Sequence, residues 1–356
     1  MLIFDAHLDL AWNALNWRRD LTRSVEEIRR SEAGMNDRRR GHNTVSLPEL
    51  RKAGVGVCLA TLLARCSDLK NPLLDYPSRE ITSAMAVGQL EYYRIMEAQG
   101  HLRMLRDASG LASHVAEWKR TGGKETPLGF VLAMEGADPI LNPEQVELWQ
   151  KRGLRVVEPV HYGVSHYAHG TGAPGGLTTA GRTLLKAMEE AGIILDVTHL
   201  ADQSFWEALD VYQGPVLASH HNCRALVPGD RQLTDEQIRA LVTRDAVIGV
   251  ALDSWMLHRN YVRGETDNSL VSMERVIDHI DHVCQLAGNA RHCGIGSDLD
   301  GGFGTEQSPR ELDTIADLQR IPDLLRRRGY QESDIEGITH GNWLEFFKNS
   351  WGSPRR

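Results

Sequence analysis

The sequence predicts an α/β protein folded as a (β/α)8 TIM barrel. Two observations predict this fold: eight short apolar or β-branched runs recur along the chain, and stretches with helical periodicity separate them. Barrels of this type also reach 356 residues as one folding unit. Because no Pro-rich or Ser-rich linker divides the chain, we expect a single barrel domain over residues 1–356.

The predicted strands and helices alternate in the order that a parallel barrel requires. The strands cover residues 2–6, 55–61, 129–134, 155–160, 193–198, 216–219, 246–252 and 293–296. The helices cover residues 78–99, 108–119, 144–151, 179–190, 203–209, 235–243 and 273–286. Two helices fill the long gap between the second and third strands, and residues 20–47 and 161–176 are expected to be rim loops.

Composition narrows the classes of function. A net charge of −8 leaves no broad basic surface for nucleic acid, and the chain has no apolar stretch of 18 residues that would cross a membrane. Five scattered cysteines, an odd number, argue against a disulfide framework or an all-cysteine zinc site. We therefore expect a cytoplasmic protein without nucleic-acid or membrane partners.

Acidic and imidazole side chains follow six of the predicted strands. Active sites of such barrels lie at the carboxyl ends of the strands, where side chains from different strands converge on one cavity. His7 and Asp9 stand two apart on an extended segment, so both point to the same side. The whole set is His7, Asp9, Glu135, His161, His199, His220 and Asp298.

These residue types indicate a metal centre. Imidazole nitrogen and carboxylate oxygen suit zinc better than magnesium or calcium. Glu135 has two carboxylate oxygens and can bridge two ions roughly 3.5 Å apart, although a charge buried in a barrel-core salt bridge is the alternative. One histidine at a strand end is more often structural than a ligand, but seven groups at six strand ends favour metal. Since neighbouring side chains alternate, only one of His220 and His221 should face the cavity.

The pattern resembles the membrane dipeptidase (renal dipeptidase) family of zinc metallopeptidases, within the metal-dependent hydrolase barrels. The resemblance extends from about Asp5 to Phe347. The segments that carry it are Asp5-Ala6-His7-Leu8-Asp9, Glu135-Gly136, Asp196-Val197-Thr198-His199, Ser219-His220 and Gly294-Ile295-Gly296-Ser297-Asp298-Leu299-Asp300-Gly301.

The resemblance implies two Zn²⁺ ions per chain and a role for each site residue. One ion would lie on His7, Asp9 and Glu135, and the second on Glu135, His199 and His220, with a water or hydroxide between them. His161 would polarise the scissile carbonyl, Asp298 would move the proton, and Arg231 would hold the terminal carboxylate of a dipeptide substrate. It also implies tolerance of a D-residue on the C-terminal side, and the family often forms homodimers.

Physical arguments support these roles independently. A fixed imidazole such as that of His161 can stabilise the oxyanion formed on attack at a carbonyl. Asp298, not needed as a ligand, can accept the proton of the water and pass it to the leaving amine. The planar guanidinium of Arg231, in a turn-rich loop after the sixth strand, can bind a carboxylate with two parallel hydrogen bonds.

Several segments depart from the family pattern and leave other readings open. The second strand, the loop at 161–167 and the end of the seventh strand at 252–255 lack residues common in the family, which puts the substrate pocket in doubt. Asp253 and Asp300 are further candidates to bind a substrate amine. One alternative is another amidohydrolase acting on a small amide, although strand one lacks His-x-His and strand four lacks Lys. The other is a catalytically altered binding homologue.

Overall fold

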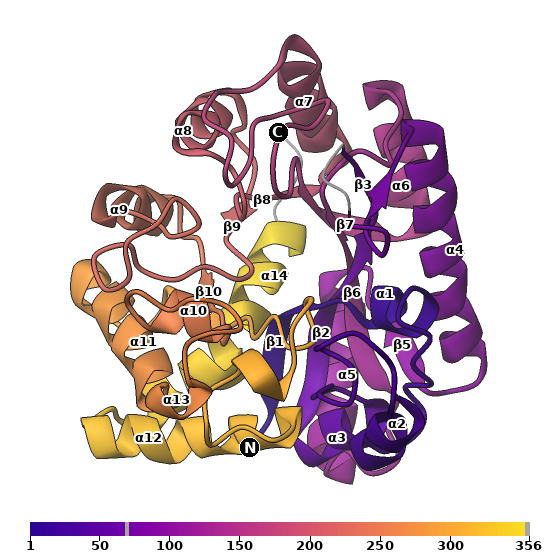
Figure 1. Ribbon diagram of the computed structural model, residues 1–356. Coiled ribbons are helices and arrows are strands. Elements are labelled where there is room, and N and C mark those ends of the chain that lie inside the picture. Colours follow the sequence, from indigo (N-terminus) through magenta and orange to yellow (C-terminus); the bar gives the residue numbers. More distant parts are fainter. Residues whose placement is uncertain (68–70, 353–356) are drawn as a thin grey trace.

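The computed structural model describes residues 1–67 and 71–352 and confirms the (β/α)8 barrel (Figure 1). Its parallel strands follow the order β10-β11-β1-β2-β6-β7-β8-β9, and a parallel bridge between Ala218 and Ile248 connects the two ends of this order. The barrel strands are β1 (Ile3–Leu8), β2 (Val55–Leu63), β6 (Leu128–Glu135), β7 (Leu154–Glu158), β8 (Ile194–Asp196), β9 (Val216–Leu217), β10 (Ile248–Val250) and β11 (Cys293–Ile295).

All seven predicted helices are present, and several begin or end at capping residues. The helix α9, for example, begins after Thr234, whose hydroxyl accepts from the Gln237 amide in a capping box. The helix α7 ends at Gly192, which adopts the left-handed conformation. These helices are α4 (Arg79–Ala98), α5 (Ala108–Thr121), α6 (Val146–Arg152), α7 (Thr179–Ala191), α8 (Asp202–Val211), α9 (Asp235–Thr243) and α11 (Glu274–Ala287).

Further elements were not predicted. The strand β5 (Leu102–Met104) pairs with residues 128–130 of β6, and β7 pairs with the later residues 132–135 of β6. A small sheet of β3 (Arg65–Cys66) and β4 (Asp75–Tyr76) lies outside the barrel. The additional helices are α1 (Leu10–Leu15), α2 (Val25–Ser31), α3 (Leu47–Lys52), α10 (Ser254–Leu257), α12 (Ile321–Arg328), α13 (Glu332–Glu336) and α14 (Asn342–Gly352).

The C-terminal helix α14 contributes to the barrel core. Its Trp343 and Phe347 stack on Phe4 of β1, with ring centroids 6.0 and 5.6 Å apart, and the indole of Trp343 donates to Ile295 O of β11. These rings belong to one apolar cluster with side chains from the barrel strands. Because Phe4 lies near the start of β1, α14 packs against the amino ends of the strands, and their carboxyl ends are left for the functional site.

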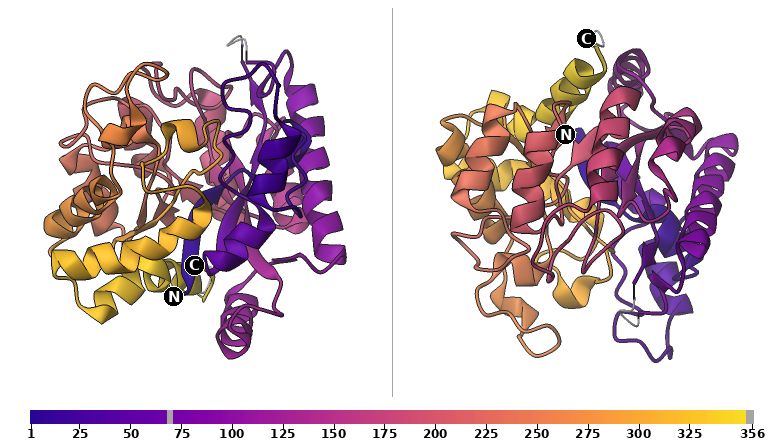
Figure 2. Two further views of the ribbon diagram at one scale, coloured as in Figure 1. Left: turned by 60° about the horizontal axis from the view of Figure 1, so that its bottom comes forward. Right: turned by 90° about the horizontal axis from the view of Figure 1, so that it is seen from above.

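The two halves of the chain lie on opposite sides of the barrel. Figure 2 shows the first half in indigo to magenta and the second half in orange to yellow. They meet where β1 pairs in parallel with β11, so His7 and Asp298 come from adjacent strands although they are far apart in sequence. Within the described residues, no helix combines the length and the apolar character that a membrane crossing requires.

Candidate metal centre

Four histidines from four strands surround one oxygen of Glu135. The Nε2 atoms of these histidines lie 3.4–3.6 Å from Glu135 Oε1. Glu135 ends β6, and its carboxylate reaches histidines at or after the ends of β1, β7, β8 and β9. The four residues are His7, His161, His199 and His220.

Two more carboxylates approach His7 from the other side. Asp9 Oδ1 and Asp298 Oδ1 lie 3.7 and 3.8 Å from His7 Nε2, and the Thr61 hydroxyl of β2 hydrogen-bonds Asp9. The structure therefore brings all seven strand-end residues together. Asp298 is the most exposed of the three carboxylates, with 15% of its side chain accessible.

Buried aspartates hold the strand ends in place. Asp5 accepts hydrogen bonds from the amide and hydroxyl of Ser297, the residue before Asp298. Asp196 accepts from the amides of Thr198 and Ser219, which precede His199 and His220. These carboxylates fix the backbone next to three site residues.

Two site residues also adopt the left-handed conformation, His199 with φ 66° and Asp298 with φ 58°. This conformation is costly outside glycine, and it persists here where the surrounding contacts impose it. It also explains why β8 and β11 end before these residues, and why the fifth predicted strand, 193–198, extends two residues too far.

Glu158 is a site residue that our sequence reasoning missed. It ends β7, is buried, and its Oε1 lies 3.9 Å from His7 Nδ1. The hydroxyl of Ser219 lies 3.4 Å from the same oxygen and 2.9 Å from His220 Nδ1. The signal was present, since a carboxylate interrupts an apolar run, but our predicted strand continued to residue 160 and Glu158 fell inside it.

Electrostatics divide the centre into charged and neutral parts. Burial raises the pKa of Glu135, but His161 and His7 outweigh burial and lower this pKa to about 2. Burial likewise lowers the pKa of His7, yet Glu135, Asp9 and Asp298 raise it to about 10. Burial holds the pKa values of His199 and His220 well below their usual range, so both imidazoles stay neutral. His7 is therefore protonated in the metal-free site, and its positive charge takes the place of a metal cation.

The residues fit a metal centre. Within residues 1–67 and 71–352, His7 Nε2 and Glu135 Oε2 are buried and lack a hydrogen-bond partner. Buried polar atoms are rarely left unpaired, so both atoms point to a missing ligand. Three groups are compact enough to hold an ion: His7, Asp9 and Asp298; Glu135, His161 and His199; and His7, Glu135, Glu158 and His220. Glu135 and His7 each belong to two of these groups. The groups differ from the ligand sets that the resemblance implies.

Arg65 determines the proton position on His161. The guanidinium Nη1 of Arg65 lies 3.0 Å from His161 Nδ1, and an arginine can only donate. Burial keeps the pKa of His161 low, at about 3, so the ring is neutral and its single proton must lie on Nε2. The ring therefore presents an N–H toward Glu135, which suits a hydrogen-bond donor better than a metal ligand.

Arg231 is buried beside the centre, with 1% of its surface exposed, although the sequence places it in a loop. One of its terminal nitrogens donates to His220 O at 2.9 Å. In the part of the chain that the structure describes, its Nη1 has no partner and no carboxylate forms an ion pair with it. A buried guanidinium without a counter-ion indicates a site for a negatively charged ligand group.

The two aspartates considered for a substrate amine are already engaged. Asp300 accepts from Thr44 N, Thr44 Oγ1 and Val45 N, and so holds the rim segment against the barrel. Both oxygens of Asp253 accept from Gln307 Nε2, at 2.8 and 2.9 Å. These contacts give both carboxylates a structural role, and of the two Asp253 also lines the cavity.

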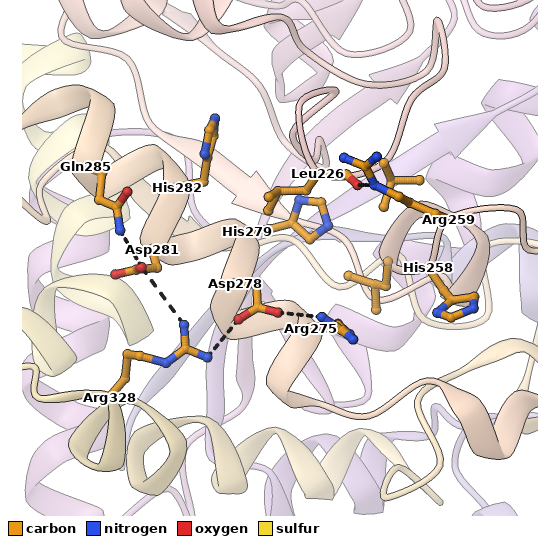
Figure 3. A pocket seen from close by; sticks show the side chains of 12 residues that line it. Leu226, His258, Arg259, Arg275, Asp278, His279, Asp281, His282, Gln285 and Arg328 are labelled. Carbon is orange, nitrogen blue, oxygen red and sulfur yellow. Dashed lines mark hydrogen bonds and ion pairs between the residues drawn. The ribbon is translucent and has the colours of Figure 1, made fainter.

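The centre opens into a cavity of about 300 Å³. Six of the eight predicted site residues line it: Asp9, Glu135, His161, His199, Arg231 and Asp298. The remaining two, His7 and His220, lie beneath them against Glu135. A second cavity, of about 490 Å³, lies along α11 (Figure 3), where Asp278 pairs with Arg275 and Arg328. Because these charges satisfy one another, we take the 300 Å³ cavity as the functional site.

Comparisons with known proteins show which family the chain belongs to. An uncharacterised protein in the pqqA 5′ region of Klebsiella pneumoniae is 34% identical over 176 residues, which cover 49% of this chain and 62% of that protein. Dipeptidase aclJ of Aspergillus oryzae is 27% identical over 332 residues, which cover 91% of this chain and 74% of that protein.

A crystal structure of a metallopeptidase from Rhodobacter sphaeroides, liganded with a phosphinate mimic of the dipeptide L-Ala-D-Ala, has a similar fold. It superposes with a TM-score of 0.80 at 23% identity and covers 99% of both chains. The sequence profile of the membrane dipeptidase family, peptidase family M19, matches residues 1–350. The chain therefore belongs to the membrane dipeptidase family.

Proposed function

We propose that this protein is a zinc-dependent dipeptidase that cleaves the peptide bond of dipeptides. The observation that carries this proposal is the cluster of four imidazoles around Glu135, with the buried, unpaired guanidinium of Arg231 beside it. The cluster offers nitrogen and oxygen ligands for zinc, and Arg231 offers a partner for a terminal carboxylate. Family membership supports the same activity.

The proposed ligands form two sets that share Glu135. His7, Asp9 and Glu135 would hold one zinc ion, and Glu135, His199 and His220 the other. When bound, the ions would supply a water acidic enough to attack a carbonyl near neutral pH. Zinc binding would require His7 to lose its proton, because the pKa of His7 is about 10 without metal. Zinc affinity should therefore weaken as the pH falls.

The remaining residues bind the substrate and move protons. Arg231 would hold the C-terminal carboxylate through its free Nη1. The N–H of His161 Nε2, directed into the site by Arg65, would donate to the carbonyl oxygen as negative charge develops there. Asp298, partly exposed to the cavity, would take the proton of the attacking water and deliver it to the leaving amine.

The direct test uses protein reconstituted with zinc and assayed with L,L and L,D dipeptides. We expect hydrolysis that disappears on chelation and returns with zinc, at about two zinc ions per chain. An L,D substrate belongs in the set because the Rhodobacter sphaeroides structure holds an L-Ala-D-Ala mimic. A binding homologue would bind dipeptides without cleaving them, and another amidohydrolase would cleave other small amides instead.

A substitution tests the assignment of Arg231. Arg231→Lys should lower kcat/KM for dipeptides about 10- to 100-fold, mainly through KM, because lysine cannot form two parallel bonds to a carboxylate. Arg30→Lys, at a side chain that is 70% exposed on α2, is the matched control and should behave as wild type. An unchanged KM in Arg231→Lys would reject the assignment.

Two finer points belong to the same proposal. We propose a cytoplasmic location, which the five free cysteines support because thiols persist in a reducing compartment. We also propose a homodimer. Light scattering of the purified protein tests the dimer, and cell fractionation tests the location.

A further inference from the structure

The cavity above the metal centre is lined by an unusual concentration of positive charge. Five arginines border it: Arg38, Arg39, Arg65, Arg231 and Arg263. Apart from the three carboxylates of the metal centre, Asp253 is the one acidic residue among the described lining residues. This concentration is local, because the whole chain carries a net charge of −8. The excess of arginine therefore belongs to the pocket and not to the protein surface in general.

Three of these arginines already have a partner or a role. Arg65 donates to Asp75 at 2.6 Å and orients His161, and Arg39 pairs with Asp37 at 2.8 Å. Arg231 is assigned to the terminal carboxylate of the substrate. Two guanidinium groups, those of Arg38 and Arg263, are left to account for.

Arg263 is held at the wall of the cavity. Its guanidinium stacks over the Trp255 ring, with its Cζ 4.5 Å from the ring centroid, and it lies 3.5 Å from Asp253. Gln307 Nε2 donates to both oxygens of that carboxylate and so fixes its position. Nearly half of the Arg263 side chain remains accessible. Arg263 is thus preorganised by stacking and still open to a ligand.

Arg263 also lies close to the reacting groups. Its charge interacts with Tyr162, whose ring packs 4.8 Å from that of His161, centroid to centroid. Both Arg231 and Arg263 influence the pKa of Tyr162, which burial raises. A substrate placed between His161 and Arg231 would therefore lie within a side-chain length of Arg263.

Arg38 lines the same cavity but comes from the rim segment at residues 20–47, in the N-terminal part of the chain. Its Nη1 lies against Gly264, so closely that a Cβ at this position would collide with it. Gly264 has φ 82° and follows Arg263 directly, so Arg38 contacts the segment that carries Arg263, and both arginines line the same cavity. Across the described residues, no carboxylate forms an ion pair with Arg38. Two guanidinium groups that line one cavity favour an anion there.

We infer that Arg38 and Arg263 bind a second carboxylate, so that the pocket selects dipeptides with an acidic side chain. This inference rests on the proposed dipeptidase function. A neutral dipeptide has one carboxylate, which Arg231 takes, and nothing to offer the other two arginines. An aspartate or glutamate side chain supplies the missing group, and a guanidinium binds it with charge-assisted hydrogen bonds.

The experiment compares isosteric substrates on the zinc-loaded enzyme. Ala-Asp is compared with Ala-Asn, and Asp-Ala with Asn-Ala, each also with the D-form of the C-terminal residue. We expect kcat/KM to be about tenfold higher for the acidic member of one pair at low salt, with the difference shrinking at high salt. The pair that shows it tells which substrate residue faces the two arginines.

Variants then locate the effect. Arg38→Gln and Arg263→Gln should each bring the acid-to-amide ratio toward one while the neutral dipeptides keep most of their rate. Arg30→Gln, which changes the net charge equally on the same rim segment outside the cavity, should leave the ratio unchanged. If loss of Arg263 disturbs Asp253 and Trp255, Arg38→Gln still gives the answer, since Arg38 supports neither.

The two proposals fail in different ways. Equal rates for acidic and amide substrates in the wild type, or an unchanged ratio in both Arg38→Gln and Arg263→Gln, would overturn the second carboxylate site alone. Absence of hydrolysis for every dipeptide with zinc bound would overturn the proposed function.

Discussion

Two groups of histidines in this protein differ in what their rings touch. In the metal centre, four imidazoles turn Nε2 toward one oxygen of Glu135 at 3.4–3.6 Å. Elsewhere, three buried histidines bond to single backbone groups at 2.8–3.0 Å. These are His114 with Gly56 O, His279 with Cys223 N and His292 with Ala246 O.

The difference shows that burial does not mark a functional histidine. A structural imidazole finds one backbone partner and is satisfied, as buried polar groups generally are. The imidazoles of the centre instead crowd a single carboxylate, and atoms such as His7 Nε2 stay without a partner among the described residues. Convergence on a shared carboxylate is therefore what separates the two groups. The predictions below test that distinction.

The largest effect is expected at the carboxylate that the imidazoles share. Glu135→Gln should lower kcat by about 10³-fold or more, because it weakens both proposed zinc positions and with them several kcal/mol of transition-state stabilisation. Metal analysis should find fewer than two zinc ions per chain. The matched control is His279→Gln in the structural group, which should retain both ions and full activity. Equal metal content in the two variants would contradict the distinction.

Asp298 should affect turnover without affecting metal. Asp298→Asn keeps the size of the side chain but removes its ability to accept a proton, so kcat should fall by about 10²- to 10⁴-fold. Zinc content should stay at the wild-type value, since Asp298 is not one of the proposed ligands. Measuring both quantities on the same preparation separates the roles. Loss of zinc together with activity would instead make Asp298 a ligand, as the group His7, Asp9 and Asp298 allows geometrically.

Glu158 should have a smaller effect, through the rings that it orients. Ser219 bridges Glu158 and His220, and Glu158 faces the Nδ1 side of His7. Glu158→Ala should weaken zinc binding by about 10-fold, a typical consequence of losing a group that orients a ligand. Competition with a chelator measures this affinity independently of catalysis. Wild-type affinity would show that Ser219 alone holds the ring of His220.

Much of the fold and the centre could be predicted because both follow from periodic signals. Apolar runs located the strands, helical periodicity located the helices, and the rule that barrel sites lie at strand ends located seven converging side chains. Glu158 escaped because the rule depends on where a strand ends, and strand ends vary by a few residues. His199 and Asp298 show why strand ends vary. Their left-handed backbone ends the strand pairing, and contacts distant in sequence impose this conformation.

The pocket wall was less predictable for a different physical reason. Arg38 and Arg263 come from two loops and Arg65 from the short strand β3, and no periodicity relates them. Arginines in polar segments are usually solvated, so the sequence alone gave no sign that these loops meet. The burial of Arg231 likewise depends on the packing of its loop against His220. Long-range contacts between irregular segments decide this part of the site.

The smallest effect is expected in the structural group, where a histidine should alter stability and leave catalysis unchanged. Burial lowers the pKa of His279 on α11 (Figure 3) to about 3. Below pH 6.5 the unfolded chain binds a proton that folded His279 excludes, so its contribution to stability is complete above pH 6.5. That contribution should fall by about 1.4 kcal/mol per pH unit as the pH drops toward 3.

Urea unfolding of metal-free protein at pH 7.5 and 5.5 measures this contribution. His279→Gln keeps an acceptor for Cys223 N but has no proton to gain. Wild type should therefore lose about 1.4 kcal/mol more than the variant between the two pH values, since only the unit below pH 6.5 counts. The other buried histidines titrate in both proteins and cancel in the difference. Parallel pH dependence in wild type and variant would mean that His279 gains its proton in the folded state as readily as in the unfolded chain.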